Sequence, residues 1–306
     1  MQQITENIST STKYEADIAQ QEKQIAALEQ IVAQKEGELL RISQEYESAA
    51  KDLKASIHYA ERIQRAVIPY DTEFKALFGD CFIYFNPKDI VSGDFYTCAS
   101  SPDFKIAIVA DCTGHGVPGG LLSMLGMSAL KDILPAQNIA AAIDPATVLD
   151  LLRKFFLTSL AEESETDDST VRDGMDISYC VFNKEMTQMR YACANHTVYV
   201  ARGGEIFKLK GSRMPIGRYP KQDEPFESFT FNLQKGDMVY LCSDGIQDQF
   251  GSPDNIKFTT KRLAAMLLEH SELDTQRQYD DIAKIVSDWK GNLEQYDDQT
   301  LIGIRI

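Results

Sequence analysis

The first part of the chain carries apolar residues at the spacing of a long helix. Between residues 14 and 67 there is no proline, and Gly37 is the only glycine. With Ile18 at position a of a heptad, every a position up to Val67 is apolar, whereas three of the d positions are polar. This pattern predicts a coiled coil of modest stability. The alternative is one amphipathic helix lying on the following domain. We favour pairing with a second copy, because a lone helix leaves its apolar seam in water.

Pro69 ends the helical pattern, because its ring and its missing N–H cannot continue a helix. We therefore divide the chain into a regulatory, dimerising segment, residues 1–66, and a second domain, residues 67–306. In the second domain, short runs rich in β-branched and aromatic residues predict strands. These runs are CFIYF, FKIAIVAD, DISYCVFN, MRYACAN, TVYVAR, IFKL, DMVYLCSDG and TLIGIRI.

Amphipathic stretches between these strands predict helices at residues 116–134, 145–163, 259–270 and 272–290. Pairs of strands separated by helices indicate two packed sheets with helices outside, which is an α+β fold. The acidic, polar segment 162–173 predicts a mobile loop.

Composition narrows the classes of function. The chain has 306 residues, 43% of them hydrophobic, and a formal net charge of −15, which argues against binding nucleic acid or anionic lipid. The N-terminus MQQITENIST lacks the features of a signal peptide, and no apolar run is long enough to span a membrane. We therefore expect a cytoplasmic protein without a membrane segment. The six cysteines form no C-x-x-C pair and lie mostly in apolar runs, which predicts reduced, buried thiols.

Several aspartates lie at the ends of predicted strands. Asp111 ends the run KIAIVAD, Asp94 lies in VSGDFY, Asp244 closes MVYLCSD, and Asp297 and Asp298 open the last strand. One Asp-Gly after a strand usually marks a hairpin turn. Several such acids suggest instead that the strand ends converge. At about 4 Å and an effective dielectric constant near 20, each like-charged pair costs about 4 kcal/mol, so the cluster requires protonation or divalent cations.

The available donors favour hard cations. The four histidines are widely separated in the sequence and form no zinc-like set, so Mg²⁺ or Mn²⁺ is the consistent choice. A pair of such ions generates hydroxide from a bridging water and holds phosphoryl oxygens for in-line attack. There is no Cys-x5-Arg motif and no Walker A loop. Hydrolysis of a phosphoester by water is therefore the predicted reaction class.

At this point the sequence resembles a known family. The segments SIHYAERIQRAVIP, PKDIVSGDFY, VADCTGHGVPGGLLSMLG, DGMDISYC, RMPIG, LQKGDMVYLCSDGIQDQFG and DDQTLIGIRI resemble, in order, the SpoIIE-type branch of the PP2C (PPM) serine/threonine phosphatases. The resemblance covers about residues 56–306. It implies an α-β-β-α sandwich, here preceded by a long coiled-coil helix, with two Mn²⁺ or Mg²⁺ ions between the sheets.

The resemblance also implies roles for single residues. Asp111 would bridge the two ions, and the carbonyl oxygen of Cys112 would bind the second ion. Asp94 would reach that second ion, and Asp244 and Asp297 would hold the first. Asp94 and Asp111 are thus the predicted catalytic pair.

Four further residues have open roles. Asp298 matches a position that usually supports the ligands, and Asp176 either serves a third ion or braces the sheet. His115 lies four residues after Asp111 rather than two, so it stabilises a turn or supports a ligand as readily as it acts as a general acid. The phosphate-binding arginine of eukaryotic members has no match, and Lys88 is the candidate substitute.

The implied substrate is a phosphoserine or phosphothreonine protein, such as an anti-sigma factor antagonist in a bacterial partner-switching pathway. The implied regulation is a switch at residues 56–69 that responds to the geometry of a coiled-coil homodimer. Two alternatives stay open. One is a pseudophosphatase scaffold that binds a phosphoprotein without hydrolysing it, and the other is an enzyme acting on a small phosphometabolite.

Overall fold

The computed structural model describes residues 2–134, 144–160, 173–251 and 253–306, with side chains for residue 14 and from residue 17 onward in those ranges. The chain forms two compact units, residues 1–56 and 57–306. Helix α1 runs from Gln2 to Arg65, so its last nine residues belong to the second unit, whereas we had placed the division at residue 66. The predicted loop at 162–173 lies outside the described residues except for Asp173.

The predicted long N-terminal helix is confirmed, and its apolar seam is exposed within a single chain. Helix α1 ends at Arg65, four residues before Pro69. The a-position side chains of Ile18, Ile25 and Val32 are 54–55% exposed. The helix therefore presents an uncovered apolar seam along the first unit, and the coiled coil remains a prediction.

Two antiparallel sheets form the second unit. The five-stranded sheet has the order β1-β13-β10-β6-β7, and the other has the order β2-β3-β4-β5-β9 with β8 paired to β4. The strands of the first sheet are β1 (Cys81–Asn86), β6 (Thr197–Arg202), β7 (Glu205–Lys210), β10 (Met238–Cys242) and β13 (Gln299–Arg305). Those of the second are β2 (Asp94–Ser100), β3 (Phe104–Cys112), β4 (Gly174–Asn183), β5 (Gln188–Ala194), β8 (Ile216–Gly217) and β9 (Phe229–Asn232). A separate short pair joins β11 (Phe250–Gly251) to β12 (Ile256–Lys257).

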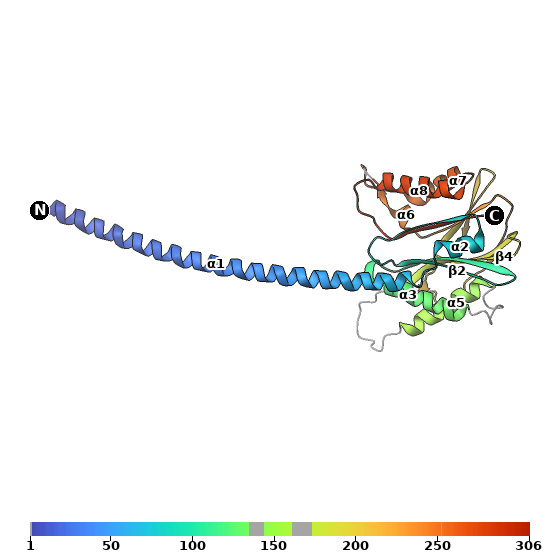
Figure 1. The fold of residues 1–306 in the computed structure, drawn as a ribbon, viewed down its shortest axis with the longest axis horizontal. Helices are drawn as coiled ribbons and strands as arrows, with labels where there is room; N and C mark the ends of the chain where they lie inside the picture. Colours follow the sequence, from blue (N-terminus) through green and yellow to red (C-terminus); the bar gives the residue numbers. More distant parts are fainter. Residues whose placement is uncertain (1, 135–143, 161–172, 252) are drawn as a thin grey trace. The chain divides into compact units, whose positions relative to one another are not determined.

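Helices cover the outer faces of both sheets. Helices α3 (Gly116–Ile133) and α5 (Pro145–Ser159) contact the six-stranded sheet, whereas α7 (Thr259–His270) and α8 (Thr275–Lys290) contact the five-stranded sheet. Figure 1 shows the two helix pairs on opposite sides of the strands. Two buried clusters result, one between the sheets and under α3 and α5, the other under α7 and α8. The predicted α-β-β-α sandwich is confirmed.

Most predicted elements occur close to their expected bounds, but several others were not predicted. These are α2 (Asp71–Phe78), α6 (Gly245–Asp248) and strands β2, β8, β9, β11 and β12. The six cysteines are free, and five of them are buried, with Cys98 half-buried. Among the helices of the described ranges, none has both the length and the apolar character to cross a bilayer.

Candidate metal and phosphate site

Three aspartates lie side by side on the six-stranded sheet. Asp94 of β2 is paired in register with Asp111 of β3, and Asp111 is paired in turn with Asp176 of β4. Directly paired residues of antiparallel strands point to the same face, with Cβ atoms about 4.5–5.5 Å apart. The strand pairing therefore lines up three carboxyl groups in one row.

The row faces the five-stranded sheet. The Asp94 Oδ2 atom accepts hydrogen bonds from the hydroxyl groups of Ser243 and Thr300, each at 2.6 Å. Thr300 lies in β13 of the opposite sheet, and Ser243 directly follows β10 of that sheet. Asp94 is 1% exposed. Its Oδ1 atom has no hydrogen-bond partner among the described residues. A buried carboxylate oxygen without a donor is costly, so this atom is a natural ligand for a cation.

The second sheet supplies acids from two neighbouring strands. Asp244 directly follows Ser243 at the end of β10 and precedes α6, and Asp297 and Asp298 precede β13, which pairs with β10. Gly245 makes this approach close, because any Cβ at that position would collide with the backbone carbonyl oxygen of Asp298. The strand ends of both sheets thus converge, as the sequence led us to expect.

A pocket of about 360 Å³ opens where these strand ends meet. Of the predicted metal ligands, Asp111, Cys112, Asp244 and Asp297 line it, together with Asp176. Asp94 is not among the described residues that line the pocket, and it lies buried beside Asp111. The structure therefore gathers all the predicted ligands at one end of the sandwich.

Burial and mutual repulsion raise the pKa values of these carboxyl groups. Loss of hydration is the first cause for Asp111, whose pKa lies well above its usual value, and the charges of Asp94 and Asp244 add to it. Burial raises the pKa of Asp94 to about 8 despite its two hydroxyl donors. Burial is also the first cause that raises the pKa of Asp176 and of Asp244 to about 6. The hydrogen bond from Asn195 partly opposes it at Asp176, whereas the charges of Asp248 and Asp297 add to it at Asp244. The cluster thus favours either protons or bound cations at neutral pH.

The donor set fits hard divalent cations in kind and in charge. It offers carboxylate oxygens and a backbone carbonyl, which Mg²⁺ and Mn²⁺ prefer. Within the described ranges, no three His, Cys, Asp or Glu side chains are already arranged around one ion. The strands therefore bring the acids to one place without forming a complete ligand set around a single point.

Asp298 holds the loop before β2 and does not line the pocket. Its two carboxylate oxygens accept hydrogen bonds from the backbone N–H groups of Lys88 and Gly93, each at 2.7 Å. Lys88 enters this arrangement through its backbone, and it is not among the described residues that line the pocket. Gly93 directly precedes Asp94, so Asp298 positions the start of the strand that carries a predicted ligand.

His115 lies in the turn between β3 and α3, at the N-cap of α3, and contacts the loop before β2. Its Nδ1 atom is 2.6 Å from a carboxylate oxygen of Asp89, and both side chains are about half exposed. His115 is not among the described residues that line the acidic pocket. Asp176, in contrast, lines the pocket and accepts a hydrogen bond from the side-chain amide of Asn195 at 2.9 Å.

Sequence reasoning missed several residues of the site. Ser243 directly precedes Asp244 and Thr300 lies two residues after Asp298, so their closeness to predicted acids in the sequence was a usable signal. Asn195, in the turn between β5 and β6, had no such signal. Arg218, which lines the pocket, directly follows the segment RMPIG that carried the resemblance.

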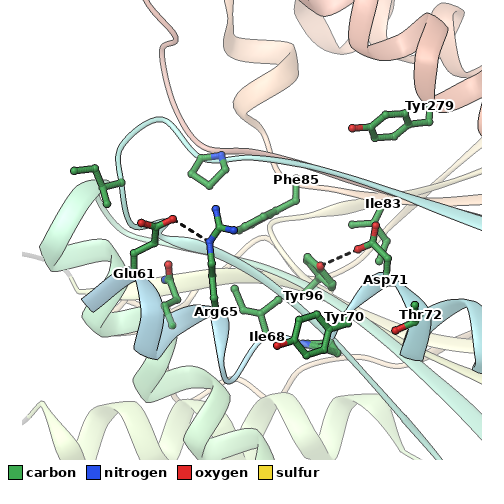
Figure 2. Close-up of a pocket in the computed structure, with 14 residues that line it drawn as sticks. Glu61, Arg65, Ile68, Tyr70, Asp71, Thr72, Ile83, Phe85, Tyr96 and Tyr279 are labelled. Atoms are coloured by element: carbon green, nitrogen blue, oxygen red, sulfur yellow. Dashed lines mark hydrogen bonds and ion pairs between the residues drawn. The ribbon is translucent and has the colours of Figure 1, made fainter. Parts of the chain in front are cut away.

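A second pocket, of about 510 Å³, lies beside residues 61–72 and is mainly aromatic and aliphatic (Figure 2). Arg65 pairs there with Glu61 at 2.9 Å, and the Tyr96 hydroxyl donates to Asp71 at 3.4 Å. A third pocket, of about 420 Å³, is lined by residues 66–70 as well. The segment that follows α1 therefore has open space on two sides.

Comparisons with known proteins define the class of protein. The SiaA-PP2C domain of Pseudomonas aeruginosa superposes with a TM-score of 0.75 and 30% identity, covering 84% of this chain and 98% of that one. The PP2C phosphatase domain of SpoIIE from Bacillus subtilis, at 17% identity and a TM-score of 0.59, shares the fold and covers 74% of this chain and 63% of that one. The fold is that of PP2C.

The family follows from the sequence. The family model described as stage II sporulation protein E (SpoIIE) matches residues 103–306, and the chain belongs to this family. The phosphoserine phosphatase RsbU of Bacillus subtilis (strain 168) is 25% identical over 264 residues, which are 83% of this chain and 71% of that protein.

Proposed function

We propose that this protein is a metal-dependent phosphatase that hydrolyses phosphoserine or phosphothreonine on a partner protein. Membership of the SpoIIE family and the likeness to a phosphoserine phosphatase support the reaction. The observation that carries the proposal is the in-register row of Asp94, Asp111 and Asp176, of which Asp111 and Asp176 line one pocket together with Asp244 and Asp297. Such a cluster suits cations that bind a phosphate group, and it does not suit an anion alone.

The proposed ligands divide between two Mn²⁺ or Mg²⁺ ions. Asp111 would contact both, Asp94 and the carbonyl oxygen of Cys112 would hold one, and Asp244 and Asp297 would hold the other. When bound, such a pair lowers the pKa of water and withdraws charge from phosphoryl oxygens.

The chain's own residues orient these ligands. Ser243 and Thr300 fix one oxygen of Asp94 and leave the other free. Asp298 holds the backbone of Gly93, and Asn195 holds Asp176. Each hydrogen bond limits the rotation of a ligand or of the loop that carries it, which is how outer residues support metal sites.

The test compares the wild type with Asp111→Asn, using p-nitrophenyl phosphate and a phosphoserine peptide with Mn²⁺ present. We expect Asp111→Asn to lose turnover while its circular dichroism spectrum stays native. Asp103→Asn is the matched control, because Asp103 is an exposed aspartate in the turn just before the same strand. Full activity of Asp111→Asn would refute the proposed centre. A wild type that binds the phosphopeptide without hydrolysing it supports the pseudophosphatase alternative, and hydrolysis of small esters alone supports the phosphometabolite alternative.

The partner we propose is a phosphorylated signalling protein, such as an anti-sigma factor antagonist in a partner-switching pathway. RsbU is named as a phosphoserine phosphatase, which supports a phosphoserine substrate. The measurement is phosphoproteomics of the host with wild type or Asp111→Asn. We expect one or a few phosphosites to accumulate in the variant, and an unchanged phosphoproteome would contradict a protein substrate.

We further propose that α1 forms a coiled-coil homodimer. The exposure of its a-position side chains supports this. In light scattering, the double variant Ile25→Asp, Val32→Asp should be monomeric, since both positions face the predicted seam. Gln30→Asp is the control, because Gln30 is at position f. A wild type that is monomeric at all concentrations tested would contradict the dimer.

Regulation through α1 is supported by the contacts of Gln64 near its end. The Gln64 side-chain amide donates to the carbonyl oxygen of Ser92 at 2.6 Å and to Ser123 Oγ at 2.8 Å. Ser92 is two residues from Asp94. Inserting four residues after Ser56 shifts the heptad phase and should change the phosphatase rate, whereas inserting seven restores the phase and should not. Equal rates for both insertions would end this part of the proposal.

A further inference from the structure

The acidic pocket contains one positively charged side chain. Of the described residues that line it, Arg218 is the only lysine, arginine or histidine, and five of the others are aspartates. In a protein with a net charge of −15, a lone guanidinium at this pocket requires an explanation.

Backbone pairing fixes where this arginine lies. Arg218 directly follows β8, whose Ile216 and Gly217 pair with Met175 and Gly174 at the start of β4. The pairing is close, since a Cβ on Gly217 would lie 2.7 Å from the carbonyl oxygen of Asp173. Met175 precedes Asp176, the third acid of the row. The arginine is therefore held beside the acids by strand pairing rather than by a free loop.

Arg218 makes no ion pair with these aspartates in the part of the chain that the structure describes. Other arginines of the second unit do pair with aspartates elsewhere in the fold: Arg202 pairs with Asp237 at 2.6 Å, and Arg190 pairs with Asp144 at 3.0 Å. Arg218 is also exposed. Its donors are thus available to a ligand that enters the pocket.

We propose that Arg218 binds the phosphate group of the substrate, through two parallel hydrogen bonds from its guanidinium to phosphoryl oxygens. This inference rests on the proposed phosphatase function. A planar guanidinium matches two oxygens of a phosphate, which a lysine ammonium does not. With the acids neutralised by cations, the pocket would offer the phosphate both the bound ions and the guanidinium of Arg218. Arg218 would then take the phosphate-binding role for which the sequence offers Lys88 as a candidate.

The test measures affinity separately from turnover. Charge-assisted hydrogen bonds of this kind correspond to a change of about tenfold to a hundredfold in affinity. We expect Arg218→Ala to raise KM for a phosphoserine peptide by that factor, with a smaller change in kcat. It should weaken the calorimetric binding of inorganic phosphate to the Mn²⁺-loaded protein by the same factor. Arg218→Lys should fall between the wild type and Arg218→Ala, since it keeps the charge and loses the fork.

Arg213→Ala is the matched control, because Arg213 is an exposed arginine of the same segment and is not among the described residues that line the pocket. It should leave both affinities unchanged. Arg218→Ala should unfold at the wild-type urea concentration, which separates binding from a structural role. Wild-type phosphate affinity in Arg218→Ala would overturn the inference. If the wild type lacks turnover, the proposed function fails, and phosphate calorimetry still decides the role of Arg218.

Discussion

Gln64 offers a stringent test of how the end of α1 is joined to the loop before β2. This side chain is 4% exposed and makes three hydrogen bonds. Its Nε2 atom donates to the Ser92 carbonyl oxygen and to Ser123 Oγ, and its Oε1 atom accepts from the Ser92 N–H at 3.1 Å. Gln64→Leu keeps the approximate volume and removes all three.

The cost follows from which groups lose every partner. The Ser92 carbonyl oxygen keeps a hydrogen bond from Ser123 Oγ at 3.1 Å, whereas the Ser92 N–H has no other acceptor among the described residues. One orphaned, buried N–H costs about 1–3 kcal/mol. Because the leucine is also buried and apolar, we expect a net loss of about 1–2 kcal/mol in the free energy of unfolding of residues 57–306.

Gln64→Glu adds a dependence on pH. The new carboxylate can accept from the Ser92 N–H but faces a carbonyl oxygen, so burial should raise its pKa above the usual value of about 4.3. A group whose folded pKa is raised contributes stability below its unfolded pKa and loses it as pH rises. Gln64→Glu should therefore be less stable at pH 8 than at pH 5, relative to the wild type.

The assay is urea unfolding followed by the fluorescence of Trp289, the only tryptophan of the chain, which lies in α8 of the second unit. Gln44→Leu is the control, since Gln44 is exposed on α1 at position f and should change stability by less than about 0.5 kcal/mol. A wild-type midpoint for Gln64→Leu, or a Gln64→Glu curve independent of pH, would show that these hydrogen bonds contribute nothing.

Three further predictions concern a buried histidine, two glycines and a buried aspartate. Burial lowers the pKa of His196 to about 4, so the free energy of unfolding should fall as pH drops from about 6.5 toward 4, with a loss of about 2 kcal/mol by pH 5. His196→Gln should lose this part of the acid sensitivity in urea unfolding, and unchanged acid sensitivity would contradict the prediction. Gly119→Ala places a Cβ against the carbonyl oxygen of Gly114 and should lower the free energy of unfolding by about 1–3 kcal/mol. Gly37 has open space around it, so Gly37→Ala should instead stabilise α1 by about 1 kcal/mol, as measured by thermal unfolding. Burial raises the pKa of Asp94 to about 8, so without divalent ions the protein should become less stable as pH rises toward that value. Mn²⁺ should therefore raise the melting temperature more at pH 8 than at pH 6, which calorimetry with and without EDTA can measure.

The sequence predicted those elements whose apolar pattern is regular. Strand β3 and the last strand are nearly continuous apolar runs, and both were found. Strand β2 was missed because Asp94 opens it and its second half is only partly buried, so neither alternation nor a full apolar run marks it. Helix α2 spans eight residues, too few for a helical period to be distinctive.

The gathering of acids at one end of the sandwich was predictable from the sequence, but the register of the strands that carry them was not. Strand ends carrying aspartates suggested convergence, yet only the pairing of β2, β3 and β4 shows Asp94, Asp111 and Asp176 in one row. Arg218 depends on β8, a strand of two residues that leaves no periodic trace in the sequence. Arg218 is placed beside the acids by pairing between distant segments of the chain, and a local sequence pattern does not reveal such pairing.

Cys98 gives experimental access to the segment that follows α1. It is the one thiol of six that is not buried, and it lines the same pocket as Val67 and Pro69. Burial raises its pKa to about 11, so alkylation should be slow there and slower still at the five enclosed thiols. A fluorescent maleimide should therefore label this position slowly but in preference to the other five, so the native sequence can be used without first removing its other cysteines. The dye would report, in real time, any displacement of the neighbouring chain.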